Sequence, residues 1–146
     1  MKTVRPIAAY PMQTLMHPRF GDVDSNRHLN NVAQARLFEE GTSALHRKAI
    51  SKRPAGRGIV AQHTLRYLSQ GSYPEPLTLG TGILRIGNRS YEIEQLLLQE
   101  GRPVSTCNTV VVYLEDKRPT ALPEHWREAL AALAIDTTLA FGEPNE

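Results

Sequence analysis

The 146-residue chain has few of the features that mark several large protein classes. It contains one cysteine, Cys107, so it cannot form an internal disulfide. One cysteine indicates neither a zinc cluster nor an oxidising compartment. The apolar run near the N-terminus, Ile7 to Ala9, is far too short for a signal peptide or a membrane span. We therefore expect a cytoplasmic protein that does not enter a membrane.

The sequence also has little net charge. Its 17 Lys and Arg residues against 15 Asp and Glu residues give +2 at pH 7. The basic residues are scattered along the chain, so nothing indicates a nucleic-acid partner, although a small ligand that bears phosphate is left open. The 40% apolar and 22% charged residues are typical of a globular protein. The length predicts a single domain, residues 1–146.

The order of apolar patterns predicts an α+β fold. Alternating and apolar runs predict strands at residues 12–20, 59–68, 77–86, 90–99 and 104–114. Short turn signals at 87–89 and 100–103 favour antiparallel hairpins. A short helix is predicted at 123–134, with Pro123 in its first turn. Four successive antiparallel strands leave one face of the sheet for the long helix that follows the first strand.

That long helix is predicted from apolar residues at helical spacing. They are Val32, Ala35, Phe38, Leu45 and Ala49, flanked by Leu37, Thr42 and Ala44. Asn30 or Asn31 is the predicted N-cap, because a side-chain oxygen there can accept a hydrogen bond from a free helix N–H. The segment 51–58 is expected to end the helix.

Polar side chains crowd the ten residues before this helix, from Asp22 to Asn31. Turn and cap formation explains such a composition without any function. A calcium loop is excluded, because the sixth position is Arg27 instead of Gly and the twelfth is Ala33 instead of Glu. An active site is the third interpretation. Unpaired N–H groups at a helix N-terminus polarise a carbonyl, and a nearby carboxylate and imidazole can activate water.

The motif "DVDSNRHLNNV", followed by "ARLFEEG", resembles the signatures of hot-dog-fold thioesterases. These include acyl-CoA thioesterases of the 4-hydroxybenzoyl-CoA thioesterase type and plant acyl-carrier-protein thioesterases. The resemblance spans about residues 12–115 and leaves the C-terminal helix outside. It implies a curled antiparallel sheet of about five strands around one long central helix. It also implies hydrolysis of an acyl thioester to free acid and CoA, or carrier-protein thiol, with no cofactor and no metal.

The resemblance assigns roles to individual residues. Asp24 matches the catalytic carboxylate, which acts as a general base on water or as a nucleophile. Asn26 and His28 match residues that position and activate the attacking group. The backbone N–H of Asn31 matches the donor to the thioester carbonyl. The resemblance further implies a homodimer or a dimer of dimers, in which both chains line each acyl pocket.

Candidate residues for contact with the substrate or CoA are Arg89, Ser90, Arg66 and Gln62. Arg89 and Ser90 lie in a turn that resembles the family's hairpin for the nucleotide, although an exposed arginine is often only a solvated charge. Arg66 stands where the plant branch has Glu, and Gln34 replaces a common aromatic residue. His63 is interpreted as a hydrogen-bonded structural residue on the strand face of Ile59, Ala61, Leu65 and Tyr67.

Two rival functions stay open. A non-catalytic module that binds acyl-CoA or acyl-carrier protein is favoured by Arg66 and Gln34, whereas Asp24 and His28 favour the thioesterase. A hydratase or dehydratase on the same fold is weaker, because those enzymes use differently spaced motifs. The acyl group and the pathway are not predicted.

Overall fold

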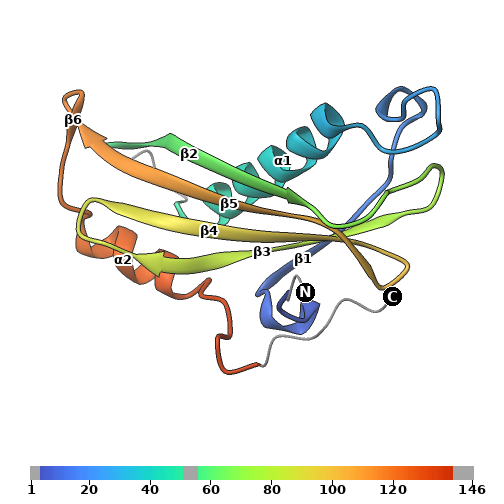
Figure 1. Cartoon of the computed structure of the whole chain (residues 1–146). Helices are drawn as coiled ribbons and strands as arrows, with labels where there is room; N and C mark the ends of the chain where they lie inside the picture. Colours follow the sequence, from blue (N-terminus) through green and yellow to red (C-terminus); the bar gives the residue numbers. More distant parts are fainter. Residues whose placement is uncertain (1–3, 51–55, 140–146) are drawn as a thin grey trace.

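The computed structural model describes residues 4–50 and 56–139. Its antiparallel sheet has the strand order β1-β3-β4-β5-β2. The long strands are β1 (Met12–Met16), β2 (Arg57–Tyr67), β3 (Leu77–Ile86), β4 (Ser90–Gln99) and β5 (Arg102–Glu115). A two-residue strand, β6 (Arg118–Pro119), pairs with the end of β5. The long helix α1 (Asn31–Ala49) lies across one face of the sheet, and α2 (Glu124–Ala131) lies near the β3–β4 turn (Figure 1).

The α+β class, the strand order along the chain and the single long helix are confirmed. The bounds of β3 and β4 match the prediction, whereas β6 was not predicted. The first strand ends at Met16, not at residue 20, because Pro18 and a 3-10 turn (η2, Phe20–Asp22) follow it. The C-terminal helix ends three residues early, at Ala131. Of the predicted helix-ending segment 51–58, residues 51–55 lie outside the described residues.

The buried face of α1 differs from the predicted apolar stripe. Its buried residues are Ala33, Gln34, Leu37, Phe38, Gly41, Thr42 and Leu45. Val32 is 62% exposed, and Ala35 is exposed as well. The predicted stripe is right for Leu37, Phe38, Thr42 and Leu45 and wrong at its N-terminal end, where the polar Gln34 occupies the buried face. Gln34 Nε2 donates to the carbonyl of Leu29, and Thr42 Oγ1 donates to Oε1 of the buried Gln95.

Three apolar clusters hold the layers together. The first joins the N-terminal half of α1 to the sheet around Phe38 and Leu97, and the second joins its C-terminal half to α2 around Tyr91 and Trp126. Gly41 lies between these two clusters. A side chain there would meet Leu79 and Gln95 within 2.6 Å, so glycine lets α1 approach the sheet closely.

The third cluster covers the outer face of the sheet, which is the face away from α1. It contains Tyr10 and Leu96. A short 3-10 turn, η1 (Ile7–Ala9), leads into Tyr10, which is 3% exposed. The N-terminal segment from Val4 to Tyr10 therefore packs against the sheet.

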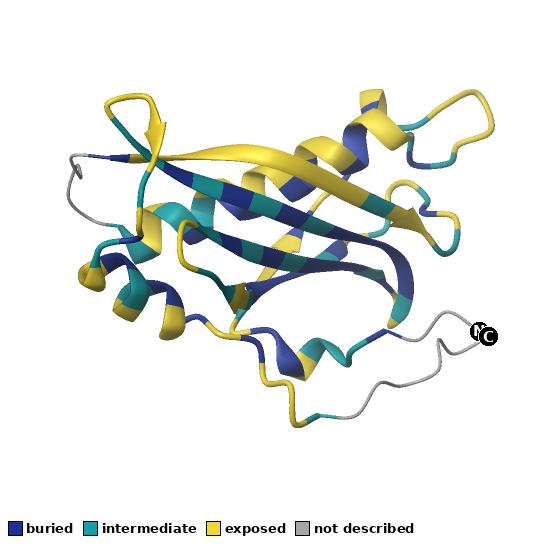
Figure 2. Cartoon of the chain, turned by 60° about the vertical axis from the view of Figure 1, so that its left-hand side comes forward, coloured by how far each residue is buried: buried dark blue, intermediate teal, exposed yellow. Residues whose placement is uncertain are grey.

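Strand β2 forms an open edge of the sheet. Every residue of β2 except Leu65 is exposed (Figure 2). The register with β5 shifts between Val60 and Gln62, so Ala61 is an inserted bulge residue. The bulge reverses the alternation before it. His63 therefore faces α1 together with Val60 and Leu65, and its predicted grouping with Ile59 is wrong.

Candidate functional site

The polar loop before α1 folds around Asp22. Asp22 is 4% exposed, and its carboxylate accepts hydrogen bonds from the Arg19 backbone N–H (2.8 Å) and the Arg19 guanidinium (3.3 Å). Burial by itself would raise the pKa of Asp22, but the bonds from Arg19 outweigh it and hold the pKa below its usual value. The Asp22 carbonyl also accepts the Asn30 N–H. Asp22 is therefore the structural aspartate of the loop.

Asp24 is the exposed aspartate of the same loop. Its Oδ1 accepts the backbone N–H groups of Asn26 (2.9 Å) and His28 (3.1 Å). Among the residues that the structure describes, Oδ2 has no hydrogen-bond partner. The turn thus fixes one carboxylate oxygen and leaves the other facing solvent. Asn26 and His28 hold Asp24 through their backbones, not through their side chains.

The helix N-terminus stands directly after this turn. Asn30 is the N-cap, as predicted, and its Oδ1 accepts the Ala33 N–H at 2.7 Å. Asn31 is the first helical residue and is exposed. Its N–H has no acceptor within the helix, because the first N–H groups of any helix lack one. An open donor with the positive end of the helix dipole behind it favours an oxygen that carries negative charge.

These groups meet in one surface cavity of about 520 Å³. Asp24, His28 and Asn31 line it, together with Arg36 and Gln70. Asn26 does not line it. The structure therefore brings together three of the four predicted catalytic residues, while the fourth supports the turn. The loop 69–73 backs this cavity, because Leu29 N–H donates to the Gly71 carbonyl and His28 pairs with Ser72.

The predicted CoA contacts do not gather at this cavity. Arg89 and Ser90 lie at the β3–β4 turn, whereas the β1–β3 end beside the polar loop is a strand length, about 30 Å, away. Arg66 and Gln62 lie on the outer face of β2, where Arg66 Nε donates to Thr106 at 3.3 Å. None of the four lines the cavity of Asp24, so their contact with a substrate stays a prediction.

Sequence reasoning missed a second cavity next to the helix N-terminus. It measures about 370 Å³ and is lined by Asn31, Gln34, Tyr67 and neighbours in the segment 68–70. Gln34 is 3% exposed, and its Oε1 is buried with no hydrogen-bond partner among the described residues. Gln34 thus replaces the family's common aromatic residue with a buried acceptor. The sequence spacing along α1 shows that Gln34 is buried only once the true buried face of the helix is known.

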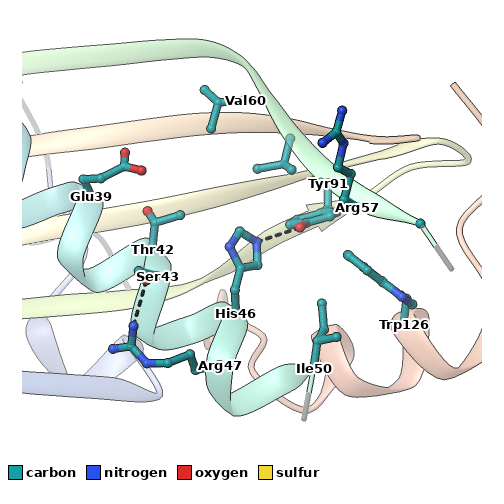
Figure 3. A pocket seen from close by; sticks show the side chains of 13 residues that line it. Glu39, Thr42, Ser43, His46, Arg47, Ile50, Arg57, Val60, Tyr91 and Trp126 are labelled. Atoms are coloured by element: carbon teal, nitrogen blue, oxygen red, sulfur yellow. Dashed lines mark hydrogen bonds between the residues drawn. The ribbon is translucent and has the colours of Figure 1, made fainter. Parts of the chain in front are cut away.

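A third cavity of about 460 Å³ lies at the opposite end of α1. Here His46 Nε2 and Tyr91 Oη are 2.6 Å apart (Figure 3). Burial lowers the pKa of His46 and raises the pKa of Tyr91, so both are neutral at neutral pH. No sequence signal links residues 46 and 91, because only the packing of α1 on β4 brings them together. The sequence therefore showed no partner for His46.

His63 lies between the ends of α1, facing the helix. Its Nδ1 is 2.9 Å from Thr109 Oγ1, and its Nε2 is 3.9 Å from Glu39 Oε2. This hydrogen bond agrees with a structural role for His63. Across residues 4–50 and 56–139, no cluster of three or more His, Cys, Asp and Glu side chains could hold a metal ion. No helix in those ranges is long and apolar enough to cross a membrane.

A family model described as "Thioesterase-like superfamily" matches residues 18–130. The chain belongs to this superfamily. The match includes the polar loop before α1, α1 itself and the long strands that follow it. It also reaches into α2, which the sequence resemblance had left outside. No curated protein matches the chain.

Solved structures show the same fold over most of the chain. A protein from Pseudomonas aeruginosa is 27% identical with a TM-score of 0.77, covering 90% of this chain and 98% of its own. A predicted thioesterase from Bacillus stearothermophilus is 27% identical with a TM-score of 0.77, covering 84% and 96%. A Thermus thermophilus thioesterase, complexed with coenzyme A and Zn, is 27% identical with a TM-score of 0.77, covering 86% and 95%. The hot-dog arrangement is thereby confirmed.

Proposed function

We propose that this superfamily member hydrolyses an acyl-CoA, or the same thioester on a carrier protein, to the free acid and the thiol. One observation carries the proposal: Asp24, with its free carboxylate oxygen, and Asn31, at the start of the helix, line the same cavity. A thioester needs a base or nucleophile on one side and a donor for its oxygen on the other. Membership of the superfamily and the CoA complex of the Thermus protein support the substrate class.

The reaction follows from these two groups. The thioester carbonyl oxygen accepts a hydrogen bond from the Asn31 N–H. This hydrogen bond strengthens as negative charge develops on the oxygen. Asp24 Oδ2 takes a proton from water, whose oxygen attacks the carbonyl carbon. The C–S bond then breaks, and the thiolate leaves and takes up a proton. In the alternative route, Oδ2 itself attacks the carbon, and water hydrolyses the resulting anhydride.

Asn26 and His28 serve this step by fixing Asp24. Two backbone N–H groups orient Oδ1, so the free oxygen keeps one direction relative to the helix N-terminus. The His28 side chain lines the cavity and is suited to orient water or the leaving group. Asn26 does not line the cavity, so we assign it only the role of shaping the turn around Asp24.

We also propose that the active form is a homodimer joined along β2. An exposed edge strand presents unpaired backbone groups that a second copy can satisfy. Ile59 and Val60 are each 40% exposed, and Tyr67 is 42% exposed. Antiparallel pairing of β2 with itself extends the sheet and leaves both α1 helices on one face. Association of two such dimers is a further prediction of the family resemblance.

The test is release of free thiol from a panel of acyl-CoAs with short, long and aromatic acyl groups. We expect hydrolysis of at least one member by the wild-type protein and about 100-fold slower release by Asp24→Asn. The control is His125→Gln, an exposed substitution on α2. Absence of turnover across the panel, with binding of acyl-CoA retained, would favour the non-catalytic binding module instead.

A further inference from the structure

We propose that the third cavity, around His46 and Tyr91, binds the far end of the acyl group and selects acyl groups that carry a hydroxyl there. This inference rests on the proposed thioester chemistry and adds a substrate class to it. The cavity lies between the C-terminal half of α1, the beginning of β2, and α2.

The cavity combines apolar walls with polar and charged lining residues, among which His46 is held in place by Tyr91. Val60, Val111 and Trp126 supply walls that suit hydrocarbon or an aromatic ring. The Tyr91 hydroxyl is committed to His46, and a side chain at Gly58 would lie 2.9 Å from that hydroxyl. Tyr91 is therefore covered, and His46 is the group that a ligand meets.

His46 offers its second ring nitrogen to that ligand. Figure 3 shows this nitrogen on the side of the ring away from Tyr91, directed toward Thr42 and Glu39. A neutral imidazole donates or accepts one hydrogen bond at such a nitrogen. Burial favours the neutral form of His46, so a neutral hydroxyl is a matching partner for its ring nitrogen. Both signs of charge line the cavity, with Glu39 on one side of the balance and Arg47 and Arg57 on the other, so we assign the selection to His46 and not to the net charge.

The cavity that serves a given Asp24 belongs to the second copy. Within one chain, the 15 residues from Asn31 to His46 span about 22 Å along α1, beyond the reach of a short acyl group. Antiparallel pairing of β2 with a second copy, with the α1-facing residues of both strands on one face, sets Tyr67 opposite Gly58 of that copy. Tyr67 lines the cavity beside Asn31, and Gly58 lines the His46 cavity. Pairing thus joins the two cavities on the α1 side of the sheet.

The experiment compares matched thioesters that differ only by a hydroxyl at the end of the acyl group, with one aliphatic pair and one aromatic pair. For at least one pair, we expect wild-type kcat/KM to favour the hydroxylated member about three- to tenfold, the size of a net hydrogen bond. His46→Leu should bring the ratio near one, because it removes the ring nitrogen that the hydroxyl would meet. Tyr91→Phe, which keeps the ring, should lower the ratio because Tyr91 positions His46. His125→Gln should leave it unchanged.

A ratio near one in the wild type, or a preference that both variants retain, would overturn the inference. Thioether analogues of the same pairs separate this failure from failure of the proposed function. A hydroxyl preference in binding that His46→Leu removes, without any hydrolysis, supports the inference and refutes the hydrolase. Hydrolysis of both members of each pair without a preference would refute the inference and support the hydrolase. Binding of neither analogue overturns both.

Mixed dimers test which copy supplies the cavity. Asp24→Asn and His46→Leu protomers, separately tagged and assembled together, form one site with both wild-type residues if the cavity comes from the second copy. That heterodimer should recover the hydroxyl preference. If the cavity came from the same chain, the only wild-type Asp24 would work with the His46→Leu cavity, and the preference would stay lost.

Discussion

Polar side chains at the two ends of α1 differ in their exposure and in their hydrogen bonding. At the N-terminal end, Asp24 is exposed, and the helix begins at Asn31 with an open N–H. At the C-terminal half, His46 and Tyr91 are hydrogen-bonded to each other within a cavity that apolar and charged side chains both line. A free carboxylate oxygen beside the positive end of a helix dipole suits chemistry on a ligand. A neutral, hydrogen-bonded pair in a cavity suits recognition of a ligand.

The largest expected effect separates chemistry from folding at the N-terminal end. Asp24→Asn keeps an oxygen that can accept the N–H groups of Asn26 and His28, so we expect turnover to fall about 100-fold or more with little change in stability. Asp24→Ala loses both bonds and should also lower the free energy of unfolding by about 1 kcal/mol. Thiol release and urea unfolding measure the two effects. Equal turnover in wild type and Asp24→Asn would contradict the assigned chemistry.

The next largest effect concerns Gly41, which sets the distance of α1 from the sheet between the two ends. Gly41→Ala adds a Cβ within 2.6 Å of Leu79 and Gln95. We expect a loss of about 1–3 kcal/mol in stability, despite the better helix propensity of alanine. Gly21→Ala is the matched control, because a Cβ there meets nothing within 4 Å. Urea denaturation compares them, and a stabilised Gly41→Ala would show that the helix has room to move.

Removal of the N-cap should have a smaller effect. Asn30→Ala loses the 2.7 Å bond to the Ala33 N–H, which we expect to cost about 1 kcal/mol of stability. Asn31→Ala should change stability less, because that exposed side chain makes no cap bond. Thermal unfolding of both variants tests the assignment. A larger loss in Asn31→Ala would mean that the cap is misplaced by one residue.

The smallest effect is a pH dependence at the other end of α1. Burial lowers the pKa of His46 below the ordinary 6.5, although Glu39 opposes this. The unfolded state therefore binds a proton at His46 more readily than the folded state does. The neutral His46 contributes to the free energy of unfolding above pH 6.5, and this contribution is lost as the pH falls below that value. His46→Gln should flatten the slope of unfolding free energy between neutral and mildly acidic pH. His125→Gln, exposed on α2, should keep the wild-type slope.

Sequence patterns predicted the fold well where local signals suffice. The bounds of β3 and β4 follow from alternating runs closed by short turns, and Asn30 was a predicted cap. The N-terminal part of the buried face of α1 could not be predicted, because Gln34 is buried through a hydrogen bond that no hydropathy pattern records. The bulge at Ala61 also leaves no sequence signal. It moved His63 away from the face of Ile59.

The candidate site also has parts that local sequence could predict and parts that it could not. Asp24, His28 and Asn31 lie close together in the sequence, so a local motif could bring them into one cavity. His46 and Tyr91 are 45 residues apart and meet only through the packing of α1 on β4. The contacts proposed for Arg89 and Ser90 depend on more than one chain, because one chain places them at the far end of the sheet.

The most direct measurement is the separation of kcat from KM at the two ends of α1, with one hydroxylated acyl-CoA as substrate. We expect Asp24→Asn to lower kcat about 100-fold with KM nearly unchanged, and His46→Leu to raise KM severalfold while largely keeping kcat. Retention of kcat in Asp24→Asn, with its loss in His46→Leu, would contradict the role of Asp24 and place the chemistry at the other end of the helix.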